Sequence, residues 1–158
     1  MIYSETEAYM KVENWLASSG VEKQSGKILD PRGCCCVTLD DDKECLIMLP
    51  TNQTNLYFIT ELYSPDPHQD IDMLIHCLTS NCIDMVLLEG ACIGLDADNR
   101  KLILRKSYPL YYGSETQFDA WLKSVQQQTE QVKEQIQLFF HAKVSSRPVA
   151  PEGRQMRL

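Results

Sequence analysis

Three apolar segments that follow one another between residues 34 and 63 constrain the fold of this chain more than any other feature. They read CCCVTL, ECLIML and NLYFITELY. The sequences between them, DDDK and PTNQ, are typical of tight turns, because Asp, Asn and Pro favour turn conformations. Strands joined by such short connections pair in the antiparallel sense. The sequence therefore predicts three antiparallel strands.

A helix is predicted before these strands and a long helix after them. Ser4 and Glu7 have the spacing of a capping box, and a helical pattern of apolar residues follows until Gly20. Its apolar positions are Ala8, Tyr9, Val12, Trp15 and Leu16. Ser114 and Gln117 cap the long helix, which is predicted to end near His141. Its apolar positions are Phe118, Trp121, Leu122, Val125, Val132, Ile136 and Phe139.

A short helix and a hairpin are predicted between them. The short helix begins at Asp66 and Pro67 and ends near Asn81. One face of it carries Ile71, Leu74, Ile75 and Leu78. Asp96 and Asp98 then have the spacing of a calcium loop, but Arg100, Lys101 and Ser107 occupy positions where calcium needs a ligand or a Gly. Alternating apolar residues flank the sequence DADN, so a hairpin is predicted instead.

This order of elements predicts a single α+β domain over residues 1–143, with a largely antiparallel sheet. Residues 144–158 are Pro-rich and polar and are predicted to form a flexible tail. From Lys143 onward the chain has four basic residues and one acidic residue, Glu152, so this tail has a net charge of +3. Because the whole chain has a net charge of −7, residues 1–142 have a net charge of −10. An acidic body disfavours nucleic acid and favours a basic or weakly structured polypeptide as partner.

The seven cysteines show no pair with the C-x-x-C spacing of a zinc site, so no metal is predicted. In a strand, Cys34 and Cys36 face one side and Cys35 the other, and free Cys packs there as a small apolar residue. A cysteine-based redox protein remains an alternative. No apolar run approaches the ~20 residues of a membrane span, and the start MIYSETEAYM does not resemble a secretory signal, so we expect a cytosolic protein.

The sequence shows no catalytic motif. The three histidines fall in no metal or hydrolase pattern, and no Gly-rich phosphate loop occurs. We therefore expect a protein that is not an enzyme and needs no cofactor.

The third predicted strand is apolar on both sides, although an antiparallel sheet covered on one side alternates apolar and polar residues. Leu56, Phe58 and Leu62 lie on one side, and Tyr57, Ile59 and Tyr63 on the other. The second side also carries Glu61, which a core does not tolerate unpaired, so that side is the better candidate for binding another chain. The alternative is that a bent sheet or a helix end covers it.

The stretch LLEGACIGLDADNRKLILRKSYPLY, followed by the capped helix FDAWLKSVQQQTEQVKEQIQLF, resembles the type III secretion chaperones of the Tir chaperone family. The resemblance extends from about Ser4 to Phe140. It implies a homodimer in the bacterial cytoplasm that binds the N-terminal segment of a secreted effector, keeps it export-competent and directs it to the secretion ATPase. A protein of the same fold with a binding role outside secretion is the alternative.

The resemblance, taken with the apolar patterns, gives two sets of site residues. The effector-binding candidates are Tyr9, Val12, Trp15, Tyr57, Ile59 and Tyr63, with Trp15 equally suited to the core. The dimer interface implied by the family is the short helix, through Ile71, Leu74, Ile75 and Leu78.

Overall fold

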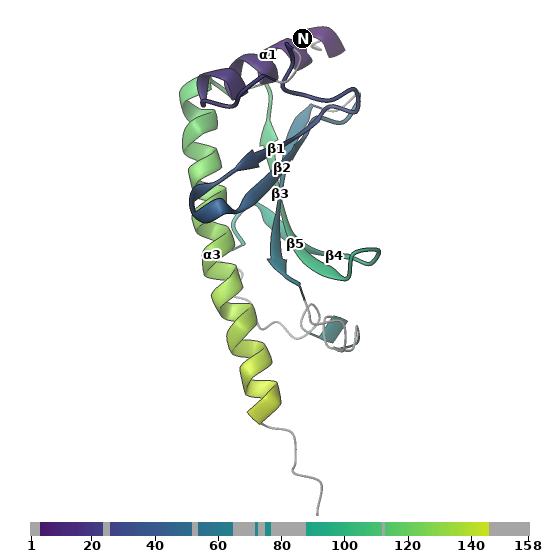
Figure 1. Cartoon of the computed structure of the whole chain (residues 1–158), viewed down its shortest axis with the longest axis vertical. Coiled ribbons are helices and arrows are strands. Elements are labelled where there is room, and N and C mark those ends of the chain that lie inside the picture. Colours follow the sequence, from purple (N-terminus) through teal and green to yellow (C-terminus); the bar gives the residue numbers. More distant parts are fainter. Residues whose placement is uncertain are drawn as a thin grey trace, which may run out of the picture.

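The computed structural model describes residues 4–23, 26–51, 54–64, 72, 75–76, 88–111 and 113–145. Five strands form one antiparallel sheet in the order β1-β2-β3-β5-β4. They are β1 (Cys34–Thr38), β2 (Glu44–Met48), β3 (Asn55–Tyr63), β4 (Ala91–Asp96) and β5 (Lys101–Pro109). The α+β prediction with a meander of three strands and a hairpin is confirmed (Figure 1). Within the described ranges, no helix combines the length and apolar character needed to cross a membrane.

The DDDK turn and the turn of the predicted hairpin form as their residue types predict, while residues 52 and 53 of the PTNQ connection lie outside the described part of the chain. The DDDK turn is a short 3-10 helix, η1 (Asp40–Asp42). In the β4–β5 hairpin, the Asn99 backbone N–H and side-chain amide both donate to the Asp96 carboxylate, at 3.2 and 2.8 Å. Asp96 therefore closes a turn, as the hairpin interpretation requires.

Both long helices begin at their predicted caps. In α1 (Glu5–Ser18), Ser4 and Glu7 make both hydrogen bonds of the capping box. Ser114 and Gln117 exchange the equivalent pair at the start of α3 (Glu115–Ser145). The helix α3 continues past the predicted end near His141 and past the predicted domain limit at 143, because no Pro or Gly interrupts it before Ser145.

The predicted short helix falls mostly outside the described residues. Asp72, Ile75 and His76 are described and are helical. Ile71, Leu74 and Leu78, three of the four residues predicted for the dimer interface, lie outside the described part of the chain.

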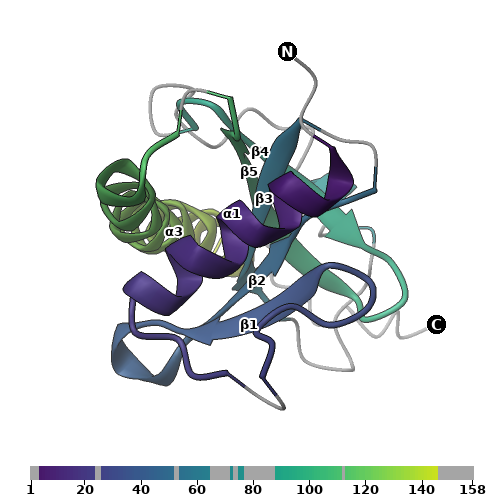
Figure 2. The same ribbon diagram turned by 90° about the horizontal axis from the view of Figure 1, so that it is seen from above.

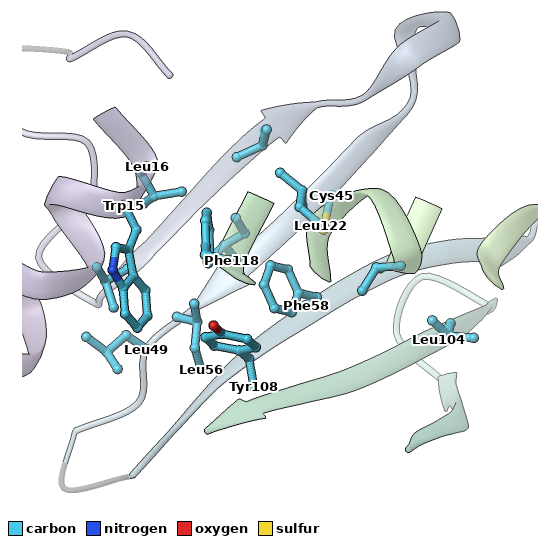
Figure 3. Packing of buried hydrophobic residues seen from close by; sticks show 14 of the residues in the cluster. Trp15, Leu16, Cys45, Leu49, Leu56, Phe58, Leu104, Tyr108, Phe118 and Leu122 are labelled. Carbon is cyan, nitrogen blue, oxygen red and sulfur yellow. The ribbon is translucent and has the colours of Figure 1, made fainter. Parts of the chain in front are cut away.

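One face of the sheet packs against the helices and forms the core. The helix α3 lies along this face and α1 crosses the end of the sheet (Figures 1 and 2). Trp15 stacks on Phe118 with ring centroids 5.6 Å apart, and Tyr108 and Phe58 pack edge to face beside them (Figure 3). The largest side chains that are fully buried are Leu16, Ile47, Leu56, Phe58, Leu102, Leu104, Leu110, Phe118 and Ile136.

A bulge in β3 corrects one predicted placement. Glu61 pairs with Ile103 but Tyr63 pairs with Leu102, so the register shifts by one residue at Leu62. Since a shift of one residue moves a side chain to the opposite face, Tyr63 turns to the core side. Its ring stacks on Phe140 of α3 at 4.5 Å. The prediction that Tyr63 shares a face with Tyr57 and Ile59 is therefore wrong.

Candidate functional site

The face of the sheet opposite the helices, called here the outer face, carries a half-buried apolar surface. Successive strands contribute to it at alternate positions, because β-strand side chains alternate between faces. Leu46 lies directly opposite Ile59, and Met48 directly opposite Tyr57. We call this set the apolar strip: Leu46, Met48, Tyr57, Ile59 and Ile103.

Charged side chains border the apolar strip. Lys101 Nζ and Glu61 Oε2 form an ion pair at 2.7 Å, with both side chains partly exposed. The prediction that Glu61 lies outside the core agrees with its exposed position at the edge of this face. The Arg105 guanidinium lies over the Tyr57 ring, 5.0 Å from its centroid. The outer face therefore combines apolar side chains with exposed charges of both signs.

The residues of α1 predicted to bind a partner are placed differently. Val12 is fully buried and Trp15 is 4% exposed, so neither can contact a partner while α1 holds its place. Trp15 packs on Phe118 and Tyr108, which makes it a core residue. Tyr9 is half-buried, and its hydroxyl donates to the Leu29 carbonyl oxygen at 2.9 Å. The prediction that Val12 and Trp15 offer binding surface is wrong for this conformation.

Residues 26–133 match the model of the Tir chaperone protein (CesT) family. The chain belongs to this family. The expectation of a type III secretion chaperone that binds effectors, and not of an enzyme, is thereby confirmed. No curated protein sequence matches the chain.

Solved structures share the fold of this CesT family member. A chain of the HopA1–SchA chaperone–effector complex matches with a TM-score of 0.58 at 15% identity, over 84% of this chain and 98% of that chain. A chain of the ExsC–ExsE complex matches with 0.59 at 14% identity, over 82% and 92%. An uncharacterized protein from Methanothermobacter thermautotrophicus matches with 0.57 at 16% identity, over 84% and 99%.

The cysteines of this CesT family member are packed as predicted for the strand β1. Cys35 turns toward the core, while Cys34 and Cys36 lie on the outer face. Burial raises the pKa of Cys35 to about 12, and burial raises that of Cys45 to about 12 as well. A thiol that stays protonated is a poor nucleophile and a poor ligand, which opposes the redox alternative at these two residues. Among the described residues, no three His, Cys, Asp or Glu side chains gather as a metal site.

Sequence reasoning missed three residues of the outer face. Leu46, Met48 and Ile103 were visible as apolar residues, but the face that each one occupies depends on the strand register. The alternation of ECLIML contains this signal for β2: Cys45 and Ile47 are fully buried, so Leu46 and Met48 must face outward. Arg105 gave no signal, because one basic residue in a strand does not reveal what it stacks on.

Proposed function

We propose that this CesT family chaperone binds an extended segment of an effector along the outer face of its sheet. The observation that carries the proposal is the apolar strip, which lies across three adjacent strands opposite the helix-covered face. Half-exposed apolar side chains that are contiguous on a surface are characteristic of binding sites. An extended segment fits such a face because its alternate side chains can lie between those of the strands.

The segment held in this way is proposed to be the N-terminal region of the effector. Held in extended form it cannot bury its own apolar residues, so it stays unfolded and export-competent in the bacterial cytoplasm. Delivery of the complex to the secretion ATPase completes the proposed role. The HopA1–SchA complex named above is a chaperone–effector complex of other proteins; it supports the class of partner proposed here.

The proposal is tested with the effector identified by capture from the native cell and mass spectrometry. Replacing Ile59 by Asp places a charge at the centre of the apolar strip, and we expect the dissociation constant to rise about 30-fold, a hot-spot effect of ~2 kcal/mol. Calorimetric titration of the purified pair measures it. Ser124→Asp, at an exposed position of α3, is the matched control.

Unchanged circular dichroism must accompany the loss of binding by the Ile59→Asp variant. Binding as tight as that of the parent protein would place the effector on another surface. A captured partner that the secretion system does not export would favour the alternative role outside secretion.

We also propose that the protein is a homodimer that uses the end of α3 and the short helix. The lower part of α3 extends beyond the sheet (Figure 1) and exposes 68% of Leu138. Ile75 is 44% exposed, and the rings of His76 and Phe139, the neighbours of these two residues, lie 5.6 Å apart. Leu138 and Ile75 are thus two exposed apolar side chains close to the contact between His76 and Phe139. A second copy of the chain could cover both in a dimer interface.

Light scattering tests the dimer. The parent protein is expected to have the mass of two chains at micromolar concentration, and Leu138→Asp to shift the mass toward one chain. Met10→Asp changes another exposed apolar residue, which lies on α1, and is expected to leave the dimer intact. A parent protein with the mass of one chain would exclude the proposal.

A further inference from the structure

Arg105 is a cation on the outer face, and binding of apolar side chains by the apolar strip gives it no role. It lies on β5, and its side chain is exposed. Lys101, four residues earlier on the same face, is paired with Glu61 at 2.7 Å. No carboxylate of the described residues forms an ion pair with Arg105, whose guanidinium lies over the Tyr57 ring at 5.0 Å.

A hollow of about 250 Å³ opens beside this guanidinium. Its lining combines the Arg105 cation with the Ser107 hydroxyl and the Asn55 side chain, both of which can donate hydrogen bonds. Asn55, Tyr57, Gly90, Ala91, Cys92, Arg105 and Ser107 line it. A space of this kind needs only about 10–15 Å³ to hold one water molecule, so the hollow has room for an acidic side chain.

We infer that this hollow receives the carboxylate of a Glu or Asp side chain carried by the bound effector segment. The inference rests on the proposed function, because it assigns one subsite of the same outer face. A guanidinium forms two parallel hydrogen bonds with a carboxylate, and the Tyr57 ring restricts its motion before binding, so less entropy is lost.

Charge makes this subsite selective. The protein has a net charge of −7, so an acidic segment gains nothing from the field of the whole molecule. Binding of an acidic side chain is favoured only beside a cation that has no ion-pair partner, and Arg105 is such a cation among the described residues. The hollow therefore discriminates among segments that the apolar strip alone would bind equally.

The strand register also fixes the spacing expected in the effector. Arg105 lies directly opposite Ile59, and Ile59 directly opposite Leu46. Neighbouring strands are ~4.8 Å apart, so the hollow lies roughly 5–10 Å from the centre of the apolar strip. Side chains on one side of an extended segment repeat every ~6.7 Å. The effector is thus expected to carry its acidic residue two positions from a large apolar one.

Three fluorescent peptides test the inference. In each, Ile alternates with Thr, and the central Ile is replaced by Glu, Gln or Lys; acetylated and amidated ends remove the terminal charges. Anisotropy titration of the full-length protein is expected to show that the Glu peptide binds about tenfold more tightly than the Gln peptide, the effect of a charge-assisted hydrogen bond. The Lys peptide is expected to bind most weakly.

Variants of the protein identify the group responsible. Arg105→Gln is expected to abolish the preference for Glu over Gln. Arg105→Lys keeps the charge without the planar fork and is expected to reduce the preference severalfold. Lys101→Gln removes a cation from the same strand and face and is expected to keep the preference. Thermal unfolding followed by circular dichroism confirms that each variant is folded.

Each contrary outcome has a defined meaning. Equal binding of the Glu and Gln peptides, with both lost in the Ile59→Asp variant, overturns the acidic subsite and leaves the outer face as the binding site. Loss of the preference in Lys101→Gln as large as in Arg105→Gln overturns it as well, since a general field then acts. Failure of all three peptides to bind overturns both the subsite and the proposed binding face.

Discussion

Among single residues, Gly113 is packed closely against two aromatic rings. A methyl group added there would lie 2.5 Å from Tyr108 Cε1 and 2.9 Å from Trp15 Cη2. Movement of either ring would disturb a core contact, because Trp15 stacks on Phe118 and Tyr108 packs against Phe58. We expect Gly113→Ala to lower the free energy of unfolding by about 1–3 kcal/mol, the usual effect of overpacking. Urea denaturation measures it.

Gly94→Ala is the matched control for this prediction. The added methyl group would lie 3.6 Å from the Ile103 side chain, an ordinary contact, and the backbone of Gly94 does not need a positive φ. Its effect is expected to stay within about 0.5 kcal/mol, because a smaller entropy of the unfolded chain offsets minor strain. Equal losses in the two variants would contradict the packing argument at Gly113.

The sequence predicted the exposure of single residues only in part. Tyr57 and Ile59 are half-exposed on the outer face, as their alternation with Leu56 and Phe58 indicates. Trp15 fits the apolar stripe of its helix equally well as core or as binding surface. What decides for the core is packing on Tyr108, which is remote in the sequence and therefore invisible to a pattern.

At the scale of elements, two hydroxyl groups join β3 to α3 inside the core. Thr60 Oγ1 and Thr129 Oγ1 are 2.7 Å apart, and the Thr129 hydroxyl also donates to the Val125 carbonyl oxygen at 2.7 Å. Since each hydroxyl has one proton, Thr60 is the donor between the two. Thr129 is thus the acceptor on which Thr60 depends.

This asymmetry predicts unequal effects of two similar substitutions. Thr129→Val leaves a buried Thr60 donor without its acceptor and is expected to cost about 1–3 kcal/mol of unfolding free energy. Thr60→Val leaves the Thr129 donor bonded to Val125 and is expected to cost less. The double variant is expected to be more stable than the sum of the two losses predicts. Equal single losses that add in the double variant would refute the assignment.

The sequence predicted elements better than their irregularities. Caps and alternation located α1, the five strands and the start of α3, because these signals lie within a few residues of one another. The bulge at Leu62 gave no such signal. It depends on how β3 pairs with β5, which lies about forty residues later, so the side of the strand that Tyr63 occupies could not be read from NLYFITELY.

At the scale of the whole molecule, buried thiols make stability depend on pH. The pKa of Cys35 and of Cys45 is raised from 9.0 to about 12, so the folded state keeps protons that the unfolded state releases above pH 9. The contribution of these two thiols to the free energy of unfolding is therefore expected to be constant below pH 9 and to fall between 9 and 12. Burial lowers the pKa of Lys106, which opposes this trend up to its usual 10.5.

Urea denaturation in the presence of a reductant, below pH 9 and again between 9 and 12, measures the effect. Cys45→Ala is expected to make the fall with pH shallower, whatever its effect on stability at neutral pH. Cys92→Ala, which changes an exposed thiol of β4 that does not act on Cys35 or Cys45, is the control and is expected to keep the slope. A slope that Cys45→Ala leaves unchanged would show that other groups cause the pH dependence.

The position of α3 at the end of the chain affects how the protein emerges from the ribosome. The strands β1, β2 and β3 are complete at Tyr63, but β5, which pairs with β3, ends at Pro109, and the covering helix ends at Ser145. At 5–20 residues per second, the core face of the first three strands waits about 4–16 s for its cover. During this interval the nascent chain exposes the apolar core face of its first three strands, so the yield of the protein in the cell depends on completing synthesis before that surface aggregates.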